Sequence, residues 1–178
     1  MSQREYRSKA VVFESLFIHQ LKAEGAFLAD LKAAGFDPAA IQTDYPHHVL
    51  NACVAVAHKH LYPELSHEEA RWKIGARFTH GVSSTLLGKV ILSALPLIGP
   101  VRYLKRVPEH MKVDDSGLEA TCTIVSAREG RLDFQGNPEV DPEFIAGMVE
   151  EGVKLTRVEP QVQLVKHVPG RFSLHIRW

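Results

Sequence analysis

The sequence is poor in cysteine and has no excess of charge of either sign. Only two cysteines, Cys53 and Cys122, occur in 178 residues, and both stand in apolar surroundings. They match neither a disulfide framework nor a zinc-binding spacing, so we expect two buried free thiols in a reducing compartment. The 21 Lys and Arg residues are balanced by 21 Asp and Glu residues. We therefore expect no nucleic-acid partner, because such proteins normally carry a basic excess.

The sequence also lacks a secretory signal and a convincing membrane span. The first residues, MSQREYRSKA, contain no apolar stretch and no cleavage site, so we expect a cytoplasmic protein. The longest apolar run covers residues 82–101 and holds one charge, Lys89. A lysine near the middle of a span costs about 2.5–3.5 kcal/mol, which argues against a membrane protein. We interpret residues 82–95 as a helix buried on nearly all sides, in the domain or at a subunit contact, and closed by Pro96 and Pro100.

The common catalytic motifs are missing, each for a specific reason. HEEAR (67–71) begins like the helix of a zinc protease, but Arg71 replaces the second histidine ligand. GVSST (81–85) is not a nucleophile elbow, because Thr85 replaces the second glycine. No phosphate-binding glycine loop occurs. We therefore assign no catalytic residue and expect a protein that is not an enzyme, although a site assembled only by folding stays open.

Histidines cluster in the segment HHVLNACVAVAHKH (47–60), which invites a metal or haem site. If 46–61 is a helix, His58 and His60 point about 200° apart and cannot share an ion. His47 and His58 share a face, but they are separated by about 16 Å along the helix axis. We expect solvated helix histidines and no metal site.

Apolar spacing predicts that the first half of the chain is helical. The best-marked start is the S-x-x-E capping box of Ser66 and Glu69, which opens a helix that continues towards Gly81. Pro46 is well placed at another helix start, because its missing N–H is not needed there. The expected helices cover residues 13–21, 27–35, 46–61, 66–81 and 82–95.

The pattern then changes to strands. LEATCTIVSAREGRLDF alternates apolar and polar residues and predicts a hairpin, and the last 21 residues predict a second hairpin that turns at Pro169–Gly170. Between them, Asp141 caps a helix over residues 142–153. We predict an α+β fold in which N-terminal helices pack on a four-stranded antiparallel sheet of chain order β-β-α-β-β. One domain, 1–178, is expected, with a helical part over about 10–106 and a ββαββ part over about 116–178.

Two features of the sequence point to a binding site. RFTHGVSSTLLGK (77–89) places polar groups beside the most apolar helix, as a small-ligand pocket requires, although these groups could simply bond the backbone at a helix junction. Residues 154–178 hold five Lys and Arg residues but only one acid, Glu159. That excess predicts a basic sheet face, which could meet an anionic partner or be the wet side of the sheet.

Six short motifs follow one another along the chain: DYP, LYPELSHEEARWKIGARF, GVSSTLLGK, LIGPVRYLKRVP, FIAGMVEEGVKL and FSLHIRW. This series resembles an uncharacterised paralogous family expanded in myxobacteria, and the resemblance runs from about residue 11 to the end. That family implies no established activity. It therefore gives no catalytic residues to carry over.

The C-terminal part of the chain is predicted to form two hairpins around a helix that contains FIAGMVEEGVKL. More distantly, this arrangement is similar to the V4R and haem-nitric-oxide-binding superfamily. Its members bind small hydrophobic or aromatic molecules, haem or partner proteins, and V4R-type domains dimerise through helices. The resemblance implies a sensory, ligand-binding domain and a homodimer. The cofactor is left open. Haem is disfavoured, because the sequence lacks the Y-x-S-x-R motif that the haem branch uses to hold the propionates.

Our leading hypothesis is a non-enzymatic sensory or regulatory domain that binds a small hydrophobic or aromatic ligand. Its apolar pocket would lie between the 82–95 helix, the 142–153 helix and the covered face of the sheet. The residues expected to form the site are Arg77, Phe78, His80, Leu87, Phe144 and Met148. The alternatives are an adaptor that docks a protein partner through the apolar helix and the basic sheet face, a haem or gas sensor with His80 or His58 as axial ligand, and an enzyme with an unrecognised site.

Overall fold

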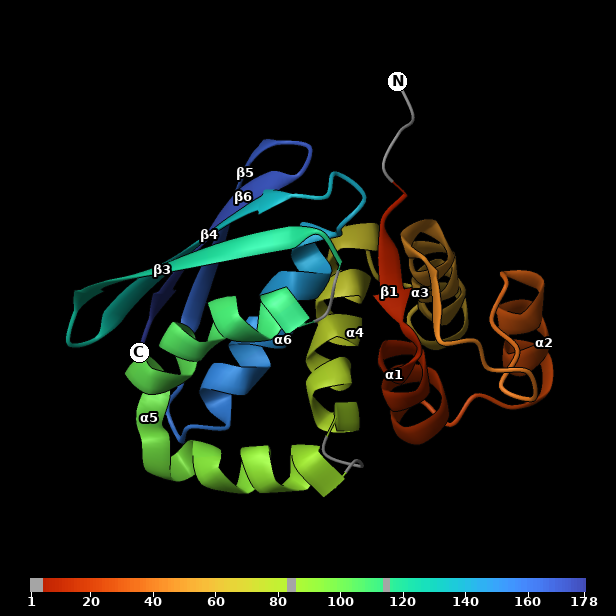
Figure 1. Cartoon of the computed structure of the whole chain (residues 1–178), viewed down its shortest axis with the longest axis horizontal. Coiled ribbons are helices and arrows are strands. Elements are labelled where there is room, and N and C mark those ends of the chain that lie inside the picture. The colour runs from red at the N-terminus through yellow and green to blue at the C-terminus, as the bar shows by residue number, and fades with distance from the viewer. Residues whose placement is uncertain (1–4, 83–85, 114–115) are drawn as a thin grey trace.

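The computed structural model describes residues 5–82, 86–113 and 116–178, and it leaves the side chains of 86–88, 91, 92 and 113 outside the description. The four-stranded sheet lies over α5 and α6 on one side of the molecule, the first helices lie on the other side, and α4 stands between them (Figure 1). In chain order the elements are β1 (Arg7–Lys9), α1 (Ala10–Phe13), the π-helix η1 (Glu14–Gln20), α2 (Gly25–Ala33), β2 (Asp44–Pro46), α3 (His47–Leu61), α4 (His67–Val82), α5 (Leu86–Val113), β3 (Leu118–Ser126), β4 (Glu129–Gly136), α6 (Pro142–Lys154), β5 (Gln161–Val168) and β6 (Arg171–Arg177).

The larger sheet has four antiparallel strands in the order β3-β4-β6-β5. Two hairpins form it, and the central pairing of β4 with β6 joins them, so that Leu132 lies opposite Leu174 and Phe134 opposite Phe172. These four side chains are buried. Helices α5 and α6 cover one face of the sheet (Figure 1). The predicted α+β fold and antiparallel sheet are confirmed.

Helices α4 and α6 cross in close backbone contact. A Cβ atom added at Gly75 would collide with the carbonyl oxygen of Phe144, and one added at Gly147 would collide with that of Trp72. Glycine at both positions therefore lets the two helices approach more closely than any side chain would permit. This contact fixes the start of α6, and with it Phe144, beside α4.

Local signals in the sequence set several helix boundaries as predicted. At the start of α4, the Glu69 N–H donates to Ser66 Oγ at 3.2 Å and the Ser66 N–H donates to a Glu69 carboxylate oxygen at 3.1 Å. At the start of α6, Asp141 Oδ1 accepts from the N–H groups of Glu143 and Phe144. The predicted capping box and the predicted N-cap are both confirmed.

The apolar helix ends just beyond its predicted boundary. Element α5 consists of two helical segments that meet at Gly99, whose φ of 71° and ψ of 170° are non-helical, so the first segment ends in the predicted region of Pro96 and Pro100. The second segment, which runs to Val113, was not predicted. The side chains of Val90 and Leu97 are 67% and 86% exposed, so α5 is not buried on nearly all sides within one copy of the chain. Burial at a subunit contact stays a prediction. No helix within the described ranges has the length and hydropathy needed to cross a bilayer.

Candidate functional site

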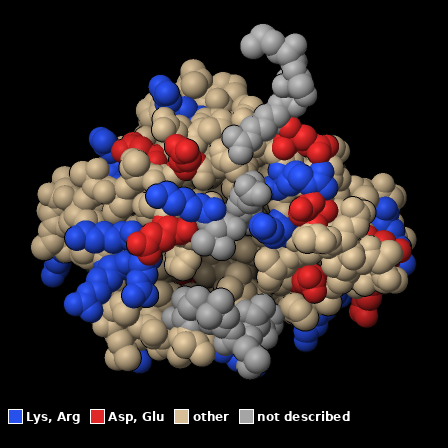
Figure 2. Space-filling model, viewed as in Figure 1, with Lys and Arg blue, Asp and Glu red and all other residues tan. Residues whose placement is uncertain are grey.

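A cavity of about 930 Å³ lies where the first helices meet the rest of the molecule. Residues of α1, η1, α3, α4, α5, α6 and the start of β3 form its wall. On the face of the molecule that Figure 2 shows, a hollow lies between α1 and the second half of α5. Protein pockets for small molecules have volumes of about 300–1,000 Å³. Much of the wall is apolar, with Leu50, Phe78, Ile98, Val107, Phe144 and Met148 among its residues.

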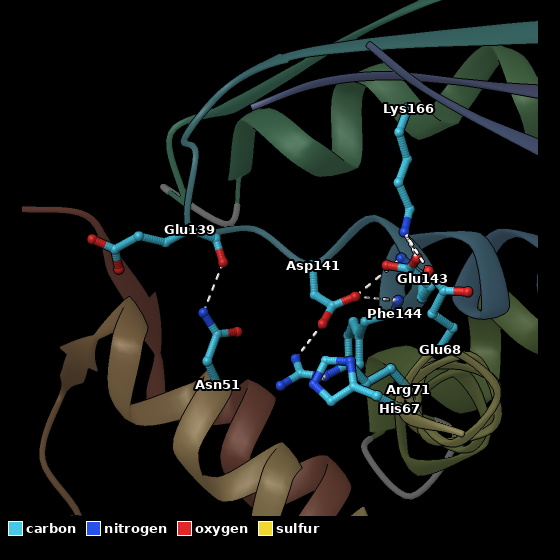
Figure 3. Close-up of polar contacts among 9 residues, drawn as sticks. All are labelled: Asn51, His67, Glu68, Arg71, Glu139, Asp141, Glu143, Phe144 and Lys166. Carbon is cyan, nitrogen blue, oxygen red and sulfur yellow. Dashed lines mark hydrogen bonds and ion pairs between the residues drawn. The ribbon is translucent and has the colours of Figure 1, made fainter. Parts of the chain in front are cut away.

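One charged pair stands in this wall (Figure 3). Arg71 of α4 and Asp141, the N-cap of α6, form a short ion pair, and their side chains are only 10% and 11% exposed. The Arg71 guanidinium also donates through Nε to His67 Nε2 at 2.7 Å. Because Asp141 accepts two backbone N–H groups of α6 as well, its carboxylate is fully engaged. The opposite charges of Arg71 and Asp141 cancel each other, and the ion pair joins α4 to the start of α6.

His47, at the first position of α3, is the buried imidazole of the wall. Its Nδ1 is hydrogen bonded to Ser8 Oγ at 2.8 Å. Burial, and then the neighbouring His48, lower the pKa of His47 to about 4, so the ring is neutral near pH 7. Although a serine beside a histidine suggests a nucleophile and its base, Ser8 is buried and does not belong to the described wall of the cavity.

Ser15 of η1 contributes a hydroxyl group that has no partner. Its Oγ is buried and makes no hydrogen bond to any described residue, and the residue is 1% exposed. Its backbone carbonyl lies against Gly81 of α4, where an added Cβ would collide with it. Ser15 is one of the residues that line the cavity, and the hydrogen-bonding capacity of its hydroxyl is unused.

The structure separates the residues that the sequence suggested. Phe78, Phe144 and Met148 line the cavity. Arg77 instead donates through Nε to the hydroxyl of Tyr62 at 3.1 Å, on the exposed side of α4. His80 is hydrogen bonded to a Glu151 carboxylate oxygen at 2.8 Å and its side chain is 47% exposed. Neither of these two residues belongs to the described wall.

Leu87 lies in α5, in the stretch whose side chains are outside the described part of the structure. Sequence reasoning missed Ser15, His47 and Arg71 as wall residues. A weak signal existed for Ser15, since it is a polar residue between the buried Val12 and Leu16 on one helical face. No signal linked Arg71 to Asp141, because the partners are 70 residues apart.

The histidines of α3 differ in part from the prediction that they are solvated. His47 is buried, and His60 is partly buried between the ring of Phe27 and the carboxylate of Asp30, to which its Nε2 is hydrogen bonded at 2.8 Å. The solvated interpretation is wrong for His47, whereas the side chain of His60 is still 22% exposed. His58 Nε2 is hydrogen bonded to the carbonyl oxygen of Leu65 at 3.1 Å. Within the described ranges, no three His, Cys, Asp or Glu side chains gather closely enough to hold a metal ion.

The basic residues near the C-terminus do not share one face of the sheet. Lys166 forms ion pairs with Glu143 of α6 and Glu68 of α4, and these contacts raise its pKa to about 12 (Figure 3). Lys154 is paired with Glu150 within α6. Lys154 and Lys166 therefore do not contribute to the predicted basic sheet face. Arg171 and Arg177 are exposed on β6, and Arg177 is paired with Glu129.

Comparison with known proteins places the chain in a family. A family model described as "Protein of unknown function (DUF2378)" matches residues 7–178. The chain belongs to the DUF2378 family. No match was found among curated proteins. The match of the DUF2378 model spans β1 to β6, so it includes every described element of the cavity wall.

Several solved structures share the fold of this DUF2378 protein. An H-NOX protein from S. oneidensis in the Fe(II)NO ligation state has a TM-score of 0.73 at 11% identity, covering 95% of this chain and 98% of that one. An unliganded Fe(II) H-NOX protein from K. algicida has a TM-score of 0.68 at 11% identity, covering 95% of both chains. A Cs H-NOX mutant has a TM-score of 0.71 at 15% identity, again covering 95% of both. The match to H-NOX proteins shows the fold. The expansion in myxobacteria and the relation to V4R domains stay predictions.

The polar groups of the wall do not fit a haem. A haem brings two carboxylates, and a carboxylate moved into an apolar cavity needs a paired cation. The guanidinium of Arg71 is the buried cation of the described wall, and Asp141 already neutralises it. Lys9 and Arg106 also line the cavity, but they lie at its exposed edge. The buried part of the described wall therefore offers no unpaired cation to the carboxylates of a haem.

Proposed function

We propose that this DUF2378 protein is a non-enzymatic sensory or regulatory domain that binds a small, mainly apolar molecule in the cavity. The observation that carries the proposal is the size and composition of the cavity, about 930 Å³ with a predominantly apolar wall. Each Å² of apolar surface that a ligand removes from water there contributes about 25 cal/mol. Phe78, Phe144 and Met148 would supply part of that contact area.

The position of the cavity provides a mechanism for signalling. On one side stand α1, η1 and α3, and on the other stand α4, α5 and α6. Two polar contacts join α3 and α4 to the start of α6: Asn51 Nδ2 donates to the carbonyl oxygen of Glu139 at 2.7 Å, and Arg71 is paired with Asp141 (Figure 3). A ligand that fits one arrangement of these elements better than another shifts the population towards it.

The chemistry of the wall supports a binding role over a catalytic one. Arg71 and Asp141 neutralise each other, and His47 is a neutral ring whose hydrogen-bonded serine lies outside the described wall. The thiol of Cys53 lies in the buried face of α3, where desolvation raises its pKa to about 12. A thiol with that pKa is not a nucleophile near neutral pH.

The proposal is tested with protein purified from its own host. Native mass spectrometry of the wild type should show a co-purified small molecule, and removing it should lower the melting temperature. The variant Val107→Trp, which fills the cavity, should lose the molecule, whereas Val168→Trp, at a strand position that is 62% exposed, should keep it. An empty wild-type protein whose crystal structure shows a collapsed or water-filled interior would contradict the proposal.

The alternative function is that of an adaptor that docks a protein partner through α5. The observation in its favour is the exposure of Val90 and Leu97, at 67% and 86%. Large apolar side chains exposed near one another often mark a contact with another chain. A second copy of this protein is the occupant that the expected homodimer would place there.

A further inference from the structure

The unpartnered hydroxyl of Ser15 calls for a physical explanation. A serine inside a helix normally points to solvent or bonds the carbonyl four residues earlier. Ser15 does neither among the described residues, since its Oγ is buried and unbonded. Such a group costs stability for as long as it has no partner, so native proteins seldom keep one without a reason. A ligand in the cavity that Ser15 lines would supply the missing partner.

The charges of the wall indicate what kind of ligand this is. Arg71 is neutralised by Asp141, and burial lowers the pKa of His47 to about 4, so neither group offers free positive charge near pH 7. At the exposed edge, the basic residues Lys9 and Arg106 stand with an acid, Glu109. An anion that entered the interior would lose its hydration and gain no counter-charge. An uncharged molecule has no such penalty.

Building on the proposed function, we propose that the ligand is an uncharged apolar molecule with a hydroxyl or carbonyl group that is hydrogen bonded to Ser15 Oγ. A serine hydroxyl both donates and accepts, so an alcohol, a phenol or a ketone satisfies it. The apolar body then lies against Phe78, Phe144 and Met148. This ligand class differs from haem, which carries charged propionates.

Three probes with one apolar body test the polar group: 2-naphthol, naphthalene and 2-naphthoate. Calorimetric titration at pH 7.5 should show that the wild type binds 2-naphthol about tenfold more tightly than naphthalene, a difference of about 1.4 kcal/mol. The carboxylate should bind most weakly. In Ser15→Ala the preference for 2-naphthol over naphthalene should disappear. The control Ser93→Ala removes an exposed hydroxyl that bonds the carbonyl of Val90 in its own helix, and it should leave the preference intact.

A melting curve separates this role from a folding defect. Because Ser15→Ala removes a buried hydroxyl that has no partner, it should raise the melting temperature of the empty protein, whereas a structural hydroxyl would lower it on removal. Equal binding of 2-naphthol and naphthalene by the wild type would overturn the inference and leave the proposed function standing. Tightest binding of 2-naphthoate, or a Soret band after incubation with hemin, would also overturn it. Failure of every probe to bind would instead overturn the proposed function.

Discussion

Arg71 and Asp141 place a full positive and a full negative charge inside an apolar wall. Each charge there depends on the other, because removal of one leaves its partner buried and unpaired. Asp141 also caps α6 through Oδ1, so a single carboxylate holds both the helix start and the pairing of α4 with α6. The two roles can be separated by substitution, since asparagine keeps the capping oxygen but loses the charge.

Asp141→Asn should lower the free energy of unfolding by about 3–5 kcal/mol through the uncompensated guanidinium of Arg71. Asp141→Ala should cost about 1 kcal/mol more, because the cap is lost as well. Urea denaturation measures both. The matched control is Asp37→Asn, where an aspartate that is 42% exposed accepts from the Ala39 N–H and pairs with Lys32. An exposed pair contributes only about 0–1 kcal/mol, so equal losses at Asp37 and Asp141 would contradict this account.

His47 should make the stability depend on pH in a defined range. Its pKa is about 4 in the folded protein against an ordinary 6.5, so the unfolded chain takes up this proton first as the pH falls. The contribution is fully present above pH 6.5 and is lost as the pH falls towards 4, by about 2–3 kcal/mol. His47→Gln, which keeps a polar partner for Ser8, should flatten the stability profile over that range. Urea titrations from pH 7 to pH 4 measure it.

His110→Gln is the control for this pH dependence. His110 is exposed, so its replacement should leave the stability profile as steep as that of the wild type. If His47→Gln and His110→Gln gave the same profile, the buried imidazole would not be the source of the pH dependence.

At the scale of single residues, the sequence predicted contacts that are local. The Ser66–Glu69 capping box and the Asp141 cap follow from spacings of three residues or fewer. The Arg71–Asp141 pair and the burial of His47 depend on which elements pack together, and no local pattern reports that. The pocket prediction correctly named Phe78, Phe144 and Met148 among the cavity-lining residues. It missed the buried polar groups beside them, because their burial depends on contacts between elements that are distant in the sequence.

Among the elements, the contact between α4 and α6 is the most sensitive to side-chain size. Gly75→Ala would push a methyl group into the backbone carbonyl of Phe144. Alanine favours a helix by about 1 kcal/mol over glycine, yet the collision should still leave a net loss of about 2–3 kcal/mol. Urea denaturation measures the change. The control Ala55→Leu adds more bulk at an exposed position of α3 and should change the stability by about 0.5 kcal/mol or less.

The course of α5 shows why its second segment was not predicted. Proline usually ends a helix because it lacks an N–H and clashes with the preceding turn. In α5 the chain turns at Gly99, and Pro100 then occupies the first turn of the new helical segment, where its missing N–H is not needed. A glycine with a φ of 71° thus converts a stop signal into a kink, and the sequence alone does not show which of the two applies.

For the whole molecule, the exposed apolar side chains of α5 predict association. We expect the wild type to sediment as a dimer and Leu97→Lys to sediment as a monomer, because a charge at a side chain that is 86% exposed in one copy would be buried between two. The control Val125→Lys changes an apolar side chain on β3 that is 58% exposed and should leave the dimer intact. Analytical ultracentrifugation checks this, and a monomeric wild type would contradict it.

The overall architecture was predictable because alternating strands and amphipathic helices each report which face is buried. Leu118 and Ala120 alternate with exposed neighbours on β3, and this pattern placed the first hairpin correctly. The packing of the first helices on the rest of the molecule was not predictable. An apolar helix face indicates that the face is buried, but it does not indicate which element covers it. The cavity arises at that junction, so its size could not be read from the sequence.

The cavity takes part of its wall from Val12 and Ser15 and the opposite part from Phe144 and Met148, which come more than a hundred residues later. A ligand bound there would contact segments near both ends of the chain and hold them together. Opening of the η1 segment would have to expel the ligand, so occupancy should slow amide hydrogen exchange across residues 14–20 before it affects the distant edge of the sheet.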